Sequence, residues 1–111
     1  MAFDIDKSFN IFVGEIVTLE GIDKEIRKGI IAIINSHKTQ NLKRKQNATK
    51  YINSISMQFE TGDDRRAAIA SDYKLIDKKT RKDLKKDILN LLRKTNPKIK
   101  DQISSLLNRY F

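Results

Sequence analysis

The sequence predicts an all-α fold: a compact bundle of five to six amphipathic helices that forms a single domain over residues 1–111. Three observations favour this fold class. The chain has one Pro and four Gly, too few for a fold with many tight turns. Its isoleucines and leucines recur at the three- and four-residue intervals of amphipathic helices. Its 39% hydrophobic and 33% charged residues are typical of a folded domain and not of a disordered chain.

The first element is expected over residues 4–20. Its apolar residues form one helical stripe: Ile5, Phe9, Phe12, Val13 and Ile16. The apolar runs on either side of Gly14-Glu15 also match two strands joined by a two-residue turn. We favour the helix, ending at Gly21, because a lone hairpin has no visible third strand to pair with.

Residues 22–59 allow two interpretations. One is an unbroken helix over about 22–60 with a long apolar stripe: Ile22, Ile26, Ile30, Ile33, Ala48, Tyr51, Ile52, Ile55 and Phe59. His37, Asn41 and Arg44 would interrupt that stripe, and the helix would extend for roughly 60 Å, longer than a compact domain of this size is wide. It would then need a partner along its polar middle, such as a second copy in a homodimer with Asn41 or Arg44 at the seam.

The other interpretation places a break near Ser36–Thr39, where a hydroxyl group can cap a second helix beginning near Gln40. We favour the break, because helices longer than about 25 residues are uncommon in globular domains. With this break His37 is a polar residue at a helix end.

Residues 61–64, Thr-Gly-Asp-Asp, form the clearest loop in the chain. Gly62 is expected to end the preceding helix, and Asp63 or Asp64 to cap the next one, over Arg65–Asp77. The inward residues of that helix are Ile69, Tyr73 and Ile76.

Two more helices are predicted at the C-terminal end. Thr80, followed by Asp83, resembles a capping box that opens a helix reaching Lys94. Asn96-Pro97 predicts the start of the last helix, because a capping residue precedes proline at the first helical position. The inner faces are expected to carry Leu84, Ile88, Leu91 and Leu92 in the first and Ile99, Ile103, Leu106, Leu107 and Tyr110 in the second.

The formal net charge is +9, and it is unevenly distributed along the chain. Residues 26–59 hold seven basic residues and no acidic one, and residues 78–111 hold eleven basic and three acidic residues. The two remaining segments are acidic: residues 1–25 hold six acids against two bases, and residues 60–77 hold five against three. Two acid-poor blocks in one small domain favour a polyanionic partner.

The sequence shows no catalytic constellation, so we expect no enzyme, cofactor or bound metal. His37 is the only histidine and there is no cysteine, which leaves histidine triads and thiolate zinc sites without their parts. The glycines sit singly, so there is no glycine-rich phosphate loop. Asp63-Asp64 is interpreted as a capping pair and not as a cation site.

The basic blocks therefore carry the functional prediction. Positive charge is disfavoured at a helix start, so Arg65 and Arg66 also suggest an external anion. The predicted phosphate-contacting residues are Lys38, Lys43, Arg44, Lys45, Lys50, Arg65, Arg66, Lys78, Lys79, Lys82, Lys85 and Lys86. Nothing in the sequence resembles a base-reading motif, so the expected contacts are to phosphates, without sequence specificity.

The sequence thus indicates a small basic cytoplasmic protein that associates with nucleic acid, an accessory or regulatory factor of a phage or other mobile element. The alternative is a module for an acidic protein partner, such as an inhibitor, an immunity protein or a scaffold, acting through an apolar helical face and complementary charge. A basic amphipathic helix lying on anionic lipid is a further possibility. The first residues lack the pattern of a signal peptide, and no apolar run is long enough to span a membrane.

Overall fold

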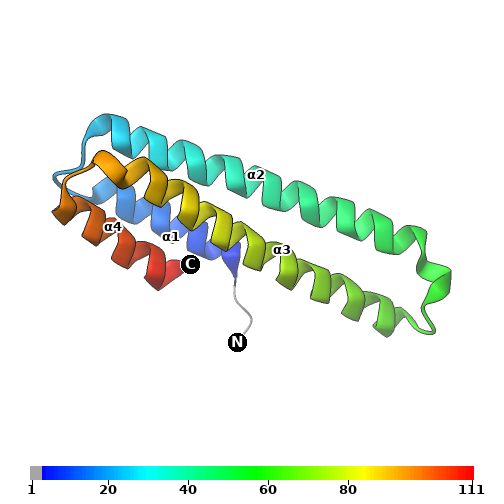
Figure 1. Ribbon diagram of the computed structural model, residues 1–111. Coiled ribbons are helices and arrows are strands. Elements are labelled where there is room, and N and C mark those ends of the chain that lie inside the picture. The colour runs from blue at the N-terminus through cyan, green and yellow to red at the C-terminus, as the bar shows by residue number, and fades with distance from the viewer. Residues whose placement is uncertain (1–3) are drawn as a thin grey trace.

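The computed structural model describes residues 4–111, and over this range the protein is all-α. It has four α-helices, two of them long, and two short 3-10 turns (Figure 1). Their bounds are Ile5–Thr18 (α1), Lys24–Ser54 (α2), Ser56–Gln58 (η1), Gly62–Leu91 (α3), Leu92–Lys94 (η2) and Pro97–Tyr110 (α4). The predicted fold class is confirmed, whereas the predicted number of five to six helices is wrong, because both long helices were expected to be divided in two.

The long helices α2 and α3 run antiparallel and form a hairpin, and the short helices α1 and α4 lie beside one half of it (Figure 1). The molecule is therefore a four-helix bundle at one end and a bare two-helix hairpin at the other. Its dimensions are 55 × 24 × 19 Å and its radius of gyration is 17.0 Å. A compact chain of this length would have a radius of about 13 Å. The prediction of a compact bundle is therefore wrong, because the molecule is an elongated rod.

The hydrophobic core lies in the bundle half, where all four helices contribute to one cluster. Its buried members are Ile5, Phe9, Phe12, Ile16, Ile22, Ile30, Ile34, Leu84, Ile88, Leu92, Ile99, Ile103, Leu107 and Phe111. The ring of Phe111 closes this cluster, with its centroid 5.6 Å from that of Phe9 and 5.5 Å from that of Phe12. Between residues 38 and 80, all of which the structure describes, Ile52 is the one buried apolar side chain.

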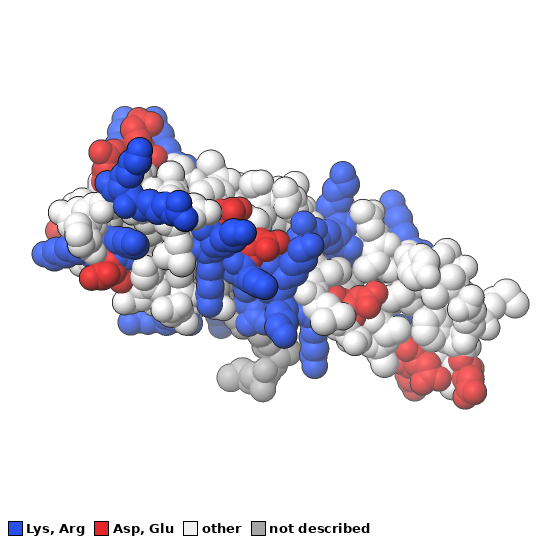
Figure 2. All heavy atoms as spheres, viewed as in Figure 1, with Lys and Arg blue, Asp and Glu red and all other residues white. Residues whose placement is uncertain are grey.

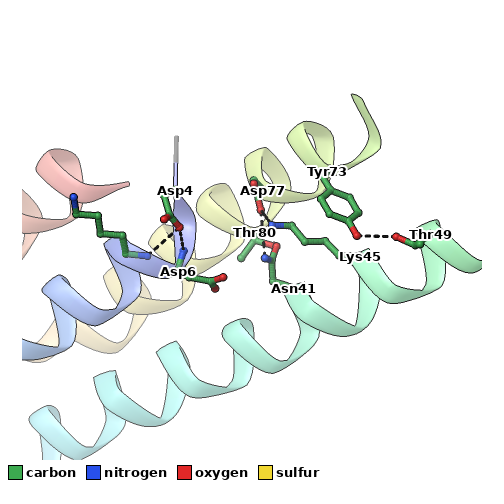
Figure 3. Close-up of polar contacts among 9 residues, drawn as sticks. Asp4, Asp6, Asn41, Lys45, Thr49, Tyr73, Asp77 and Thr80 are labelled. Atoms are coloured by element: carbon green, nitrogen blue, oxygen red, sulfur yellow. Dashed lines mark hydrogen bonds and ion pairs between the residues drawn. The ribbon is translucent and has the colours of Figure 1, made fainter. Parts of the chain in front are cut away.

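Local capping fixes where the helices begin. Asp4 Oδ1 accepts hydrogen bonds from the backbone N of Asp6 at 3.1 Å and of Lys7 at 3.2 Å, so α1 is the predicted helix and not the alternative hairpin (Figure 3). Asn96 Oδ1 accepts from the backbone N of Lys98 at 2.8 Å and Pro97 opens α4, as predicted.

The loop before α3 differs from its prediction. Thr61 Oγ1 accepts from the backbone N of Asp64 at 3.1 Å, so Thr61 is the capping residue and Gly62 is the first residue of the helix. Asp63 and Asp64 lie in the first turn instead, where their negative charge interacts favourably with the helix dipole.

The predicted break at Ser36–Thr39 is wrong, because α2 is continuous through it. Thr39 Oγ1 donates to the carbonyl oxygen of Asn35 at 3.0 Å, a bond within the helix and not a cap. His37 and Asn41, at 8% and 2% exposure, lie inside the protein against α3 and not at a helix end. A polar residue in an apolar stripe thus marks a buried polar contact here and not a helix boundary.

The predicted helix start at Thr80 is wrong for the same reason. Thr80 lies in the middle of the continuous helix α3 and is 0% exposed. Its hydroxyl donates to the side chain of Asn41 and caps no helix.

The unbroken-helix interpretation was nearer to the structure, although α2 ends at Ser54, before residue 60. Its polar middle is covered by α3 of the same chain, with Asn41 bonded to Thr80 and Asp77. The seam that suggested a homodimer is thus formed within one chain. Tyr51, which was expected on the apolar stripe, is 64% exposed.

Two glycines permit local geometry that other residues would disturb. Gly21 has φ of 80° in the turn between α1 and α2, a conformation that side chains with a Cβ rarely adopt. Gly29 packs against α3, since a Cβ built on it would stand 2.8 Å from Leu91 Cδ2. Both glycines are at the bundle end, where the packing is tight.

Replacing Ile30 with Ala should lower the free energy of unfolding by about 2–5 kcal/mol, because the side chain is fully buried in the bundle core. Urea denaturation followed by circular dichroism measures this change. Leu42→Ala on the same helix, at 58% exposure, is the matched control and should cost less than about 1 kcal/mol. Equal losses in the two variants would contradict the orientation of α2 described above.

Candidate nucleic-acid interface

A polar seam joins α2 and α3 at the level where the four-helix bundle gives way to the hairpin (Figure 3). Asn41 Oδ1 accepts a hydrogen bond from Thr80 Oγ1 at 2.6 Å, and Asn41 Nδ2 donates to Asp77 Oδ1 at 3.3 Å. Lys45 Nζ lies 2.8 Å from the same Asp77 oxygen. The polar seam consists of Asn41, Lys45, Thr49, Tyr73, Asp77 and Thr80.

Farther along the hairpin, Tyr73 completes the seam. Lys45 Nζ lies 5.2 Å from the centroid of the Tyr73 ring, and the Tyr73 hydroxyl is 2.7 Å from Thr49 Oγ1. The side chains of Lys45 and Asp77 are only 17% and 15% exposed, so water screens their attraction less than it would on the surface. Lys45 is thereby committed to the seam.

The contacts of the seam fix the rotation of α3, so that a face rich in lysine is exposed to solvent. The exposed residues between positions 74 and 86 are five lysines and Leu75. We name the lysines the lysine face: Lys74, Lys78, Lys79, Lys82 and Lys86. The acids of this segment lie elsewhere, since Asp77 is in the seam and Asp83 is partly buried. Asp87, the next residue, has its Oδ2 2.6 Å from His37 Nε2.

The lysine face has an energetic cost within the chain. Lys74, Lys78, Lys82 and Lys86 are spaced four residues apart, so each lies directly over the next. Each like-charged pair at this spacing destabilises a helix by a few tenths of a kcal/mol. None of the five lysines forms an ion pair within residues 4–111. A bound polyanion would remove this repulsion, and uncompensated local conflicts of this kind are typical of functional surfaces.

Helix α2 widens the basic region. Lys38, Lys43 and Lys50 are exposed, and α2 has no acidic residue after Glu25. Contacts such as Asn41 with Thr80 and Lys45 with Asp77 place this part of α2 against the opposite side of α3, at the same level of the rod as the lysine face. Figure 2 shows a cluster of Lys and Arg side chains over the middle of the rod, with a few acidic side chains beside it and further acidic side chains at the tip of the hairpin and at the bundle end.

The twelve residues predicted from the sequence fall into three groups. Exposed in the middle of the rod are Lys38, Lys43, Lys50, Lys78, Lys79, Lys82 and Lys86. Partly buried in the same region are Arg44, Lys45 and Lys85. Far from both, at the tip of the hairpin, are Arg65 and Arg66.

The two tip arginines have acceptors within the chain. Arg66 Nη2 pairs with Asp63 Oδ1, and Arg65 Nη1 donates to Asn53 Oδ1 at 3.4 Å. These contacts within the chain account for the two positive charges at this helix start without an external anion.

Lys74 is absent from the residues predicted from the sequence, because it lies within the acidic segment 60–77. Its spacing of four residues from Lys78 is the signal that identifies it as part of the same face.

The part of the chain that the structure describes brings no group of three or more His, Asp or Glu side chains together as metal ligands. None of the helices in residues 4–111 has both the length and the apolar content needed to cross a bilayer. No protein-family model matches the chain, and comparisons with curated proteins and with solved structures give no match either.

Replacing Asn41 with Leu should lower the free energy of unfolding by about 1–3 kcal/mol, because the buried hydroxyl of Thr80 loses its acceptor. Urea denaturation of Asn41→Leu, Thr80→Val and the double variant forms the appropriate cycle. The double variant should lose less than the two single losses combined, since both partners of the bond are then removed. Strict additivity would argue against the bond between Asn41 and Thr80.

Proposed function

We propose that this chain is a small basic nucleic-acid-associated protein of the cytoplasm, a non-catalytic accessory or regulatory factor that contacts phosphates. The observation that carries the proposal is the lysine face of α3, where Leu75 is the one exposed residue between positions 74 and 86 that is not lysine. Lys38, Lys43 and Lys50 on α2 add exposed positive charge at the same level of the rod. Lys45, Arg65 and Arg66, which have partners within the chain, have no part in the proposed contact surface.

The chemistry of these side chains suits phosphate contact. A lysine ammonium group is a compact point charge on a flexible stem, without the planar fork that reads base edges. Neutralising phosphates releases condensed counterions, which gives affinity without dependence on base sequence. The arrangement therefore supports binding to the backbone of a nucleic acid and not recognition of a particular site.

The rigid helix that carries these lysines also favours phosphate binding. The lysines stand on one continuous helix whose rotation is held by the buried contacts of Asp77 and Thr80. Because α3 does not have to fold when a ligand arrives, binding incurs no loss of backbone entropy in this region. The acidic residues Glu60, Asp63 and Asp64 are confined to the tip of the hairpin, away from the lysine face.

A protein-binding module is the second candidate. Met57 at the tip is 98% exposed, and Tyr51, one turn before the end of α2, is 64% exposed. Apolar residues at the end of a protruding hairpin can anchor a protein partner. Single exposed apolar side chains are common on protein surfaces and need no explanation, so these two weigh less than the five lysines of the lysine face.

Lys78→Gln/Lys82→Gln should weaken binding to labelled duplex DNA by on the order of tenfold at low salt, because two central phosphate contacts are lost. Fluorescence anisotropy measures the affinity. The matched control is Lys24→Gln/Lys98→Gln, which removes the same charge from exposed positions at the loop end of the bundle. The control pair should bind nearly as tightly as the unchanged protein.

Equal weakening in the two pairs would show that net charge alone governs the affinity and would contradict the assignment of the lysine face. If the unchanged protein binds neither DNA nor RNA even at low salt, the proposed function is wrong. A pull-down with Met57→Ser as the comparison would then test the protein-binding alternative.

A further inference from the structure

We infer that the nucleic acid held by the lysine face is double-stranded, whether DNA or RNA. This inference rests on the proposed function and specifies the ligand of the same surface. Three features of the structure carry it: the position of the aromatic side chains, the fixed geometry of the lysine row, and the chemical uniformity of that row.

Aromatic side chains are missing from the lysine face. Proteins that hold single strands stack successive bases on several aromatic rings along a basic groove. Among residues 4–111 Tyr51 is the one exposed aromatic residue, and it lies on α2 toward the tip of the hairpin. The nearest ring on α3 is that of Tyr73, which is held in the seam by Lys45 and Thr49. A single strand could interact with the positive charge of the lysine face, but no aromatic ring there would stack on its bases.

The lysine row has a fixed length and spacing. Steps of four residues along α3 separate the lysines by about 6 Å, and the row from Lys74 to Lys86 extends for about 18 Å. A duplex is stiff, so its phosphates already stand at fixed positions, whereas a flexible strand loses entropy when it is aligned on a row of fixed spacing. The major groove of B-form DNA is about 12 Å wide, so a row of this length reaches phosphates on both of its sides.

The row is chemically uniform. Its exposed side chains are lysine and Leu75, with no Asn, Gln or Arg that could pair bidentately with a base edge. A single strand offers its unpaired base edges as its distinguishing feature, and the row has no planar amide or guanidinium group to pair with them. The row can instead contact phosphates that stand at a regular spacing. A duplex has this regular spacing, and a flexible single strand lacks it.

The full-length chain tests this inference by anisotropy titration against duplex DNA, duplex RNA and the matching single strands over a range of salt concentrations. A duplex should bind at least about tenfold more tightly than its separate strands, with a slope of log affinity against log salt of about −4 to −5 for five phosphate contacts. The ranking of the DNA and RNA duplexes identifies which of the two is the ligand.

Three single variants locate the contact. Lys78→Gln should make the salt slope shallower by about one unit, because one phosphate contact is lost. Lys98→Gln, an exposed lysine on α4 away from the lysine face, should leave the slope unchanged. Tyr51→Ala should leave the affinity for every ligand unchanged, because the inference gives that ring no base to stack on.

The possible failures are distinguishable. Tighter binding to single strands, or loss of single-strand affinity in Tyr51→Ala, would overturn the double-stranded ligand while the proposed function stands. An unchanged slope in Lys78→Gln would remove the lysine face from the contact. Absence of binding to all four nucleic acids at low salt would overturn both the inference and the proposed function.

Discussion

The rotation of α3 about its own axis determines which of its residues meet solvent, and the contacts of Thr80 and Asp77 with Asn41 fix that rotation. A helix turned by one residue, about 100°, would bring Lys78 to the position of Asp77 against α2 and place an ammonium group where the seam has a carboxylate. The apolar side chains farther along α3 depend on the same alignment, because Leu84 and Ile88 enter the bundle core one and two turns after Thr80. One small hydrogen-bonded layer thus links the packing of the bundle to the composition of the exposed surface.

The sequence predicted the short helices well and the long helices poorly. The boundaries of α1 and α4 follow from local signals, a capping side chain followed by apolar residues on one face. The continuity of α2 and α3 depends on a partner helix, because His37 and Thr80 are stable inside a protein only where Asp87 and Asn41 stand opposite them. Periodicity within one segment cannot identify such partners, so polar residues within an apolar stripe were interpreted as helix ends.

The candidate site was likewise predicted in part from the sequence. The two basic blocks were visible in the sequence, and most of the predicted residues lie in the middle of the rod. Which basic residues remain free for a partner was not visible. Lys45 is occupied by Asp77, and the arginines that open α3 lie far from the lysines and have acceptors of their own. Lys74 joins the lysine face because of the rotation of α3, although its neighbours in sequence are acidic.

The placement of the hydrophobic core at one end gives the rod a gradient of local stability. Between residues 38 and 80 Ile52 is the one buried apolar side chain, so the distal hairpin opens at a lower free energy than the bundle does. The lysine face crosses this boundary, with Lys86 at the level of the core and Lys74 beyond it. Because the whole row stands on one continuous helix, this gradient places the least stable part of the protein at the tip of the hairpin, beyond the lysines, where local opening leaves their spacing unchanged.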